Sequence, residues 1–590
     1  MSDLLFKKVD YTVGKLLEDI ALGEIALPDI QRPFVWDTTR VRDLLDSMYR
    51  GYPIGTLLFW ENGYPGEHRF IGTGTKQKTP RLLIVDGQQR LTALYAVMKG
   101  VPIVDKNFQK RRLRIAFNPL EEKFEVTNTA IERDPNWVPD ISLLWRPDFD
   151  QYAFVSLYLE RLGERRELTP EVRKRIPQAV QRLVNLINYP MTALEISVQA
   201  TEEQVSEIFV RINSRGRSLN QADFILTLMS VFWDEGRKQL EDFSRRAKQP
   251  SPDGSPSPYN PYFQPQPDQL LRVSVALAFR RARLEQIYSI LRGKDLQTGE
   301  FSPERRDAQF ALLQEAQTQV LNLQHWHDFL KVVKRAGYIH PSLITSRTSL
   351  VYTYALWLIG KLDFGLDPHA LRDLMARWFF MSALTGRYTS SPETRMDQDL
   401  ALLRGLSRPE EFVRVLEQEM AAVLTPDYWE VTLPNELATA SAQSPGQAAF
   451  FASLCLLDAP VLYSSMKVRD LLDPNAQAYK SALERHHLFP RKYLMRQGIA
   501  DKRDINQVAN YALVEWHDNI RINDRPPAEY APEYERRFSP QELKEMYRYH
   551  ALPEGWYAMD YPEFLEERRR LMAAVIREGF ERLRGGHGTG

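Results

Sequence analysis

The chain has 590 residues, 43% hydrophobic and 26% charged, and its 77 basic and 77 acidic residues leave a net charge of zero. This length exceeds what one hydrophobic core supports, so about two to four domains are expected. The balanced charge excludes a uniformly basic chain, and any phosphate-binding surface must be a local patch. The single cysteine, Cys455, excludes an intrachain disulfide and a cysteine-based zinc site.

The first residues lack the apolar core of a signal peptide. The most hydrophobic run, TSLVYTYALWLIG (348–360), is too short to cross a bilayer and is expected to be a buried helix. Together with the near absence of cysteine, these features predict a cytoplasmic protein without a membrane span.

The first hundred residues alternate between helical and strand patterns. In VRDLLDSMYRG, the residues Val41, Leu44, Leu45 and Met48 share one helical face, and Asp37 is a suitable N-cap. The patterns predict an α/β unit with a helix at 41–51, a buried strand at 81–85, a helix at 91–100 and a hairpin at 111–126.

Helical patterns dominate from about residue 150 to residue 470. Residues 250–267 contain seven prolines and are expected to be a loop. The terminal stretch EERRRLMAAVIREGFERLR (566–584) predicts an amphipathic helix whose arginines face solvent. We expect three parts, at 1–150, 151–470 and 471–590.

The stretch LLIVDGQQRLTAL places Asp86, Gly87, Gln88, Gln89 and Arg90 between the predicted strand and helix. Such a turn exposes backbone N–H groups at the positive end of a helix dipole, which favours phosphate binding. Gly87 would let a ligand approach the backbone, and Arg90 could donate two hydrogen bonds to phosphate oxygens. The spacing alone leaves open a plain polar connection in which Asp86 caps the helix.

Three further stretches accompany this turn: IQRPFVW (30–36), GYPIG (51–55) and FVRINSRGRSL (209–219). In this order, the four motifs closely resemble the N-terminal domain of GmrSD-type and SspE-type restriction proteins. The resemblance implies a ParB-like fold whose DGQQR element binds and hydrolyses a nucleoside triphosphate, with ATP, GTP and CTP not distinguished. It assigns to the nucleotide site Asp86, Gly87, Gln88, Gln89 and Arg90, with Gln31 and Arg32 nearby. It leaves open whether Arg211 and Asn213 belong to that site or only form a structural turn.

Near the C-terminus, ERHHLFPRKYL (484–494) places His486 and His487 side by side. If YALVE (511–515) is a strand and a helix begins near His517, the order is strand with the histidines, strand preceded by Asn510, and helix with Asn519. A ββα-metal nuclease needs this order, because one histidine takes a proton from water while a divalent ion binds the scissile phosphate. A histidine pair in isolation would instead favour a structural role.

The same segment resembles the HNH-like domain that is fused to this N-terminal family. The shared pattern is HLFP, then Ala-Asn before an apolar strand, then Asn nine residues later, then Pro-x-x-Tyr. The resemblance implies that His487 is the general base, that Asn510 orients the loop and the base, and that His486 and Asn519 hold one divalent ion. A histidine at position 486, where an aspartate is common, leaves open whether the ion is Mg²⁺ or Mn²⁺.

We therefore predict an α+β multidomain protein with a ParB-like N-terminal α/β domain, a largely α-helical middle and a C-terminal ββα-metal (HNH) nuclease domain. The predicted function is an anti-phage restriction endonuclease that nicks or cuts DNA. Control would come from nucleoside triphosphate hydrolysis or from DNA modification, either on phage DNA or as host phosphorothioate marks. A nucleotide-switched DNA-binding adaptor with an inactive HNH domain and an RNA-directed nuclease remain alternatives. A homo-oligomer is compatible with the sequence.

Overall fold

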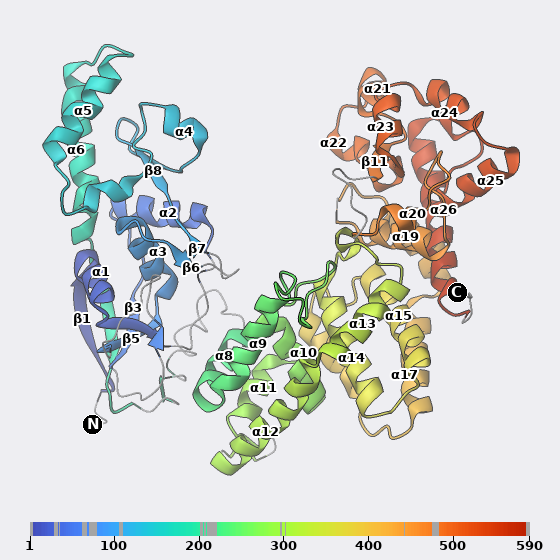
Figure 1. Cartoon of the computed structure of the whole chain (residues 1–590), viewed down its shortest axis with the longest axis horizontal. Coiled ribbons are helices and arrows are strands. Elements are labelled where there is room, and N and C mark those ends of the chain that lie inside the picture. Colours follow the sequence, from blue (N-terminus) through green and yellow to red (C-terminus); the bar gives the residue numbers. More distant parts are fainter. Residues whose placement is uncertain are drawn as a thin grey trace. The chain divides into compact units, whose positions relative to one another are not determined.

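The computed structural model of the chain describes residues 4–28, 34, 36–61, 68–69, 80–104, 110–200, 204–205, 208, 221–295, 298–300, 302–441, 443–474 and 483–585. The chain forms two compact units, Met1–Asp234 and Glu235–Gly590 (Figure 1). The predicted boundaries at residues 150 and 470 fall inside these units.

The first unit is built around a mixed sheet of six strands in the order β1-β10-β3-β5-β2-β4. Neighbouring strands are antiparallel in the pairs β1–β10, β3–β5 and β2–β4, and parallel in the pairs β10–β3 and β2–β5. Because β10 lies between β1 and β3, this unit must extend well past residue 150. The strands are β1 (Phe6–Thr12), β2 (Ile25–Pro28), β3 (Leu57–Glu61), β4 (His68–Arg69), β5 (Leu82–Asp86) and β10 (Pro190–Ile196).

The central strands of this sheet are buried on both faces. Leu57 and Phe59 belong to the larger apolar core, whereas Leu58 and Trp60 belong to a smaller one on the opposite face. Successive side chains of a strand alternate between faces, so two covered faces require a continuous apolar run. The helices of this unit are α1 (Val13–Leu22), α2 (Thr38–Tyr49), α3 (Gln88–Met98), α4 (Thr129–Arg133), α5 (Gln151–Gly163), α6 (Pro170–Val184) and α8 (Gln221–Phe232), with 3₁₀ turns η1 (Ile141–Trp145) and η2 (Asn185–Asn188).

The elements predicted for the first unit are present. The helix at 41–51 is α2, and the carboxylate of Asp37 caps it by accepting a hydrogen bond from the backbone N–H of Arg40 at 2.7 Å. The strand at 81–85 is β5 and the helix at 91–100 is α3, which begins at Gln88. The hairpin consists of β8 (Ile115–Asn118) and β9 (Lys123–Val126), preceded by the short pair β6 (Ile103–Val104) and β7 (Lys110–Arg111).

The second unit is mostly helical. The apolar run at 348–360 lies in α14 (Arg347–Leu362), where every residue from Ser349 to Gly360 is buried, as predicted. Residues 250–266, all of them described, form neither helix nor strand, which confirms the proline-rich loop. No helix among the described residues combines the length and the apolarity that crossing a membrane requires.

The helical part of this unit precedes its small sheet. Its helices are α9 (Asp234–Arg246), α10 (Pro267–Phe279), α11 (Leu284–Leu291), α12 (Pro303–Val320), α13 (Leu323–Arg335), α14, α15 (Pro368–Leu384), α16 (Pro392–Leu402), α17 (Pro409–Val423), α18 (Leu433–Glu436), α19 (Pro445–Leu456) and α20 (Val468–Leu471), with short turns η3 (Pro341–Leu343) and η4 (Tyr428–Thr432).

The C-terminal part contains the predicted strand, strand and helix in that order. They are β11 (Leu483–His487), β12 (Tyr511–Glu515), which pairs antiparallel with β11, and α23 (Trp516–Ile522). Two short helices and a 3₁₀ turn connect the strands: α21 (Arg491–Arg496), α22 (Lys502–Ile505) and η5 (Val508–Asn510). After α23 come α24 (Pro527–Glu535), α25 (Pro540–Tyr549), η6 (Trp556–Ala558) and α26 (Tyr561–Arg582).

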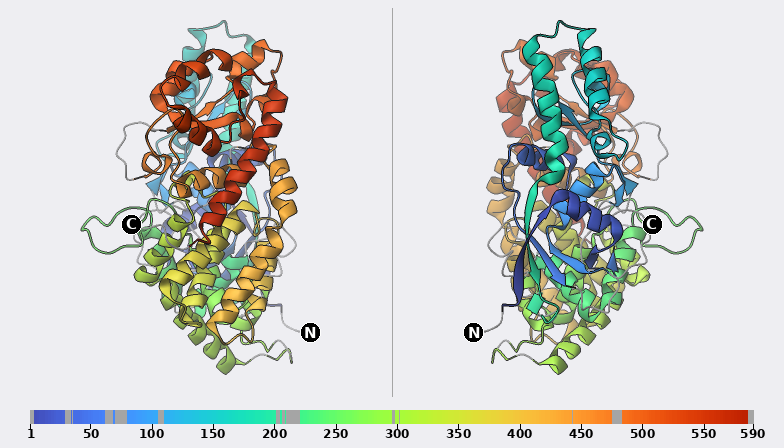
Figure 2. Two further views of the ribbon diagram at one scale, coloured as in Figure 1. Left: turned by 90° about the vertical axis from the view of Figure 1, so that its right-hand side faces the viewer. Right: turned by 90° about the vertical axis from the view of Figure 1, so that its left-hand side faces the viewer.

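The long last helix joins this part to the helices before it. Figure 2 shows α26 in red, extending from the C-terminal part to the preceding helices. Its Phe580 ring packs against Phe380 and Trp429, with centroids 5.8 and 5.9 Å away. A Cβ on Gly579 would lie 2.4 Å from Ser453 Oγ of α19, so the two helices touch closely. This packing explains why residues 471–590 belong to the same compact unit as the helical middle.

Candidate active site

The two adjacent histidines end strand β11 and have separate surroundings. Neighbouring residues of a strand point to opposite faces, so the two rings diverge. His486 is only 3% exposed and contacts Asn519 of α23. His487 is half-buried and lies against Tyr511, its cross-strand partner, with ring centroids 4.4 Å apart. The pair is therefore not a two-histidine chelate.

His486 and Asn519, the predicted metal ligands, are in direct contact. His486 Nδ1–H donates a hydrogen bond to Asn519 Oδ1 at 2.9 Å, across 33 residues of sequence. Burial lowers the pKa of His486 to about 4, so the ring is neutral at neutral pH. Its buried Nε2 has no hydrogen-bond partner within the described part of the chain. The ring packs edge-on against Tyr530, of the predicted Pro-x-x-Tyr pattern, at 5.8 Å.

The predicted ligand atoms, Nδ1 and Oδ1, lie 2.9 Å apart, which is the length of an ordinary hydrogen bond. For both atoms to bind a divalent ion, the His486 proton would have to move from Nδ1 to Nε2, and the two side chains would have to turn so that both lone pairs face the ion. Over the described ranges, no group of three or more His, Cys, Asp or Glu side chains is arranged to hold a metal. Two neutral ligands would thus leave most positions to water and phosphate.

The predicted general base, His487, has one engaged and one unengaged ring nitrogen. Its Nε2–H donates to Asn506 Oδ1 at 3.0 Å, and Nδ1 has no hydrogen bond to any described residue. Burial lowers the pKa of His487, the hydrogen bond with Asn506 raises it, and the charges of Arg491 and Arg485 lower it again. The net effect is a lowered pKa, which favours the neutral ring that can accept a proton.

Asn510 is fully buried and holds the connection between the two strands. Its Oδ1 accepts from the Phe489 N–H at 2.9 Å, and its Nδ2 donates to the carbonyls of Phe489 at 3.1 Å and Ile505 at 2.9 Å. These contacts are with backbone groups, and the described hydrogen bonds of Asn510 include none to His487. The predicted orientation of the loop thus has a structural basis, and Asn510 is a positioning residue.

Helix α26 supports the same connection through residues that the sequence did not single out. Arg568 is fully buried, and its guanidinium donates to the carbonyls of Ala509 at 2.5 Å and His550 at 3.1 Å. Tyr561 donates its hydroxyl to the Asp504 carbonyl at 2.7 Å. The prediction that the arginines of this helix face solvent is therefore wrong for Arg568, whose backbone partners lie far away in the sequence. The charge run EERRR gave no signal that separates Arg568 from its neighbours.

The second predicted site is the DGQQR turn between β5 and α3. Gly87 is the N-cap of α3 at φ 95°, and a Cβ there would lie 2.3 Å from Leu57 Cδ2, so this turn requires glycine. The alternative in which Asp86 caps the helix is wrong, because the cap position belongs to the next residue. Gln88 and Gln89 are buried, at 9% and 8% exposure.

Arg90 joins this turn to the GYPIG motif. Its Nη1 donates to the Ile54 carbonyl at 2.7 Å and its Nη2 to the Thr56 carbonyl at 2.8 Å, and the Asp86 carboxylate lies 3.4 Å away. Burial lowers the pKa of Arg90, and the charge of Asp86 opposes that shift. A phosphate would have to compete with two carbonyls for this guanidinium. The other predicted residues near this site, Gln31, Arg32, Arg211 and Asn213, lie outside the described residues.

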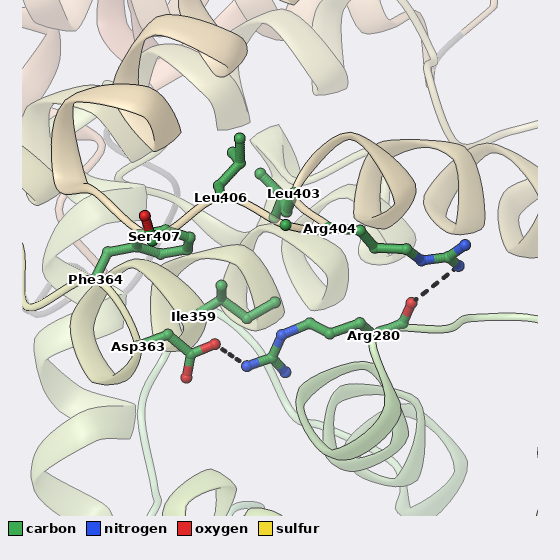
Figure 3. Close-up of a pocket in the computed structure, with 9 residues that line it drawn as sticks. Arg280, Ile359, Asp363, Phe364, Leu403, Arg404, Leu406 and Ser407 are labelled. Atoms are coloured by element: carbon green, nitrogen blue, oxygen red, sulfur yellow. Dashed lines mark hydrogen bonds and ion pairs between the residues drawn. The ribbon is translucent and has the colours of Figure 1, made fainter.

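A pocket of about 340 Å³ in the second unit contains none of the predicted site residues (Figure 3). Arg280 pairs there with Asp363, and Arg404 Nη2 donates to the Arg280 carbonyl at 3.5 Å. Arg280 also donates to the Leu277 carbonyl at the end of α10. Its guanidinium is thus used within the protein, and this pocket does not extend the candidate site.

The comparisons with known proteins give more information about the N-terminal part of the chain than about the C-terminal part. Residues 13–230 match the family described as "GmrSD restriction endonuclease, N-terminal domain". An uncharacterized protein of Methanocaldococcus jannaschii, MJ0686, is 23% identical over 543 residues, covering 87% of this chain and 84% of the relative. Since 87% of the chain exceeds the share of either compact unit, this likeness extends into both. The resemblance predicted for the N-terminal part is confirmed for GmrSD-type restriction proteins. The resemblance to SspE-type proteins, the ParB-like fold and the resemblance of the C-terminal part to HNH-like domains stay predictions.

Proposed function

We propose that this protein is a restriction endonuclease that cuts or nicks DNA at the β11–β12–α23 site, under control of nucleoside triphosphate binding in its first unit. The contact between His486 and Asn519 carries this proposal, together with the adjacent His487, whose Nδ1 has no hydrogen bond within the described part of the chain. His486 and Asn519 are in contact although 33 residues of sequence separate them, and His487 is the next residue along β11.

In the proposed hydrolysis of a phosphodiester bond, the side chains around β11 have different roles. His487, neutral because of its lowered pKa, accepts a proton from the attacking water. His486 and Asn519 would hold a divalent ion, which supplies charge stabilisation at the scissile phosphate. Arg485 and Arg491 are exposed and form no ion pair with any described residue, and their charges act on His487. Such guanidinium groups suit the flanking phosphates of a nucleic acid strand.

The first unit supports a restriction role and a nucleotide switch. Residues 13–230 match the N-terminal domain family of GmrSD restriction endonucleases. Arg90 links Ile54 and Thr56 to the DGQQR turn, so two motifs of that resemblance form one structural element. We assign triphosphate binding and hydrolysis to this element, and sensing of DNA modification to the protein as a whole.

A plasmid-nicking assay tests the nuclease assignment. The full chain is incubated with supercoiled DNA and Mg²⁺ or Mn²⁺, with each triphosphate in turn, on unmodified, glucosylated and phosphorothioate-marked DNA. We expect strand breaks that EDTA prevents, and a loss of about 10²-fold or more in His487→Ala, the usual contribution of a general base. The matched control is His369→Ala, an exposed histidine of α15 remote in sequence from the site.

The outcomes separate the proposal from its alternatives. Equal cleavage by wild type and His487→Ala would contradict the assignment of the base. Retention of DNA without strand breaks under every condition would favour the adaptor with an inactive site. Cleavage of RNA in the same mixtures, with DNA left intact, would favour the RNA-directed nuclease.

A further inference from the structure

Asn506 lies between the candidate base and its aromatic neighbour. Its Oδ1 accepts from His487 Nε2–H at 3.0 Å and from the hydroxyl of Tyr511 at 3.4 Å. The rings of His487 and Tyr511 are tilted by 41° at a centroid distance of 4.4 Å. One amide oxygen thus fixes two side chains that already pack against each other.

The backbone around Asn506 is held from both sides. Asn506 follows the last residue of α22, and its N–H donates to the carbonyl of Lys502, the first residue of that helix, at 3.0 Å. The preceding carbonyl, of Ile505, accepts from Asn510 Nδ2 at 2.9 Å, and the carbonyl of Asp504 accepts from the Tyr561 hydroxyl at 2.7 Å. Because these partners come from η5 and α26, the position of the Asn506 side chain is set by the packed structure and not by a free loop.

An amide oxygen can only accept a hydrogen bond, so the nitrogen that faces it must carry a proton. In a neutral imidazole the other nitrogen then holds the lone pair. We propose that Asn506 is the positioning residue of the candidate base, which keeps the proton of His487 on Nε2 and leaves Nδ1 to accept the proton of water. This inference rests on the proposed nuclease function for its catalytic meaning, but the hydrogen bond itself can be measured separately.

The kinetic test compares two replacements of similar size. Asn506→Leu removes the acceptor, whereas Asn506→Asp retains an oxygen that can accept from Nε2–H. We expect Asn506→Leu to lower kcat by about tenfold or more, the usual effect of removing the group that orients a functional histidine, with little change in KM for DNA. We expect Asn506→Asp to keep kcat within a few-fold of wild type. The matched control is Gln507→Leu, because Gln507 Nε2 donates to the Arg503 carbonyl at 2.8 Å and not to His487.

A purely structural role for Asn506 predicts another pattern. In that case Asn506→Asp would lose as much kcat as Asn506→Leu, or Gln507→Leu would lose as much as either, and each result would overturn the proposal. A wild-type kcat in Asn506→Leu would overturn it as well. Thermal unfolding of every variant identifies any that fails to fold. If Asn506→Leu does not fold, the ¹⁵N spectrum of the wild-type protein still shows which ring nitrogen of His487 carries the proton.

The spectroscopic test needs neither DNA nor metal. The full chain is labelled with ¹⁵N at its histidine rings, and His487→Ala identifies the signals of His487. We expect Nε2 of His487 to be protonated and Nδ1 to be unprotonated in the wild type, and the Nε2 signal to shift in Asn506→Leu. A proton on Nδ1, or an Nε2 signal that is unchanged in Asn506→Leu, overturns the inference. Loss of the nuclease function alone, seen as equal cleavage by His487→Ala, would leave this spectrum as expected.

Discussion

The two predicted sites of this chain differ in what their functional groups contact. In the C-terminal site, the side chains of His486 and Asn519 contact each other, and Nδ1 of His487 has no hydrogen bond to any residue that the structure describes. In the DGQQR turn, the guanidinium of Arg90 donates hydrogen bonds to two backbone carbonyls of its own unit. In the first site the contact joins two side chains for which we propose a ligand, whereas in the second the guanidinium predicted to bind phosphate binds the backbone instead.

This difference shows that a functional motif can contain residues of two kinds. The Arg90 guanidinium binds the carbonyls of Ile54 and Thr56 and lies against Gly55, where a Cβ would be 2.6 Å from Nη1. Asn510 has the same kind of role in the C-terminal site, since the three hydrogen bonds of its side chain go to backbone groups. Replacing a residue that holds the backbone of a site should cost more stability than replacing a residue that acts on a ligand, whose main effect should be on activity.

The largest expected effect on stability belongs to Asn510. Asn510→Ala would remove the side-chain partner of the buried Phe489 N–H and carbonyl, each worth about 1–3 kcal/mol, and would leave the Ile505 carbonyl only the bond from the Tyr561 hydroxyl at 3.3 Å. We therefore expect the free energy of unfolding to fall by about 3–5 kcal/mol. Asn519→Ala removes one hydrogen bond and should cost about 1 kcal/mol. Urea unfolding followed by tryptophan fluorescence measures both variants. Equal losses would remove the distinction between positioning and ligand-binding residues within this site.

The next effect in size is a pH dependence of stability that comes from a buried histidine of the second unit. Burial lowers the pKa of His550 to about 4 in the folded state, and its Nε2–H donates to the Pro460 carbonyl at 2.9 Å. With an unfolded value near 6.5, the unfolded chain takes up a proton between pH 6.5 and 4 while the folded chain does not. This contribution is complete above pH 6.5 and is lost as the pH falls toward 4, by about 3 kcal/mol.

His550→Gln tests this linkage, because glutamine retains an N–H donor and does not titrate. We expect its unfolding free energy to decline less than that of the wild type between pH 7 and pH 4.5, in urea titrations at each pH. Carboxylates titrate in both proteins, so the difference between them isolates the histidine. Identical declines would show that His550 is not neutral and buried. The first unit contains one histidine, His68, and should contribute little.

Local patterns predicted the elements of both sites, but not their tertiary partners. The apolar run of α14 and the strand–turn–helix around Gly87 follow from periodicity and glycine. The spacing of His486, His487, Asn510 and Asn519 predicted the strand–strand–helix order. In contrast, Arg568 bonds to a carbonyl 59 residues away, and carbonyl directions are not visible in a sequence.

The predicted boundary at residue 150 shows the same limitation at a larger scale. Strand β10 pairs with β1 and with β3, both more than a hundred residues earlier in the chain. A change in composition toward helical patterns gives no information about such long-range pairing. Asn506 escaped prediction for a similar reason, since only the fold brings its side chain to His487.

A smaller effect is expected at Arg90. Arg90→Ala removes two charge-assisted hydrogen bonds to carbonyls, and we expect a loss of about 2 kcal/mol in the stability of the first unit. Arg90→Lys should recover only part of this, because an ammonium group cannot bridge two carbonyls in the manner of a planar guanidinium. Triphosphate binding, and the response of DNA cleavage to triphosphate, should weaken in parallel with stability. Wild-type stability with complete loss of binding would instead place Arg90 on the phosphate.

The smallest expected effect concerns the metal requirement. Replacing His486 or Asn519 by alanine removes one of the two proposed ligands, so we expect the Mn²⁺ concentration for half-maximal cleavage to rise by about tenfold, or about 1.4 kcal/mol. His517→Ala is the matched control, since His517 is exposed on α23 two residues before Asn519. A Mn²⁺ titration of nicking measures all three variants, and a crystal soaked in Mn²⁺ gives an independent readout.

An ion absent from between His486 Nδ1 and Asn519 Oδ1, or the same Mn²⁺ requirement in all three variants, would show that this contact is only a structural hydrogen bond. The contrast between the C-terminal site and the DGQQR turn would then disappear, because the polar side chains of each would only stabilise the fold.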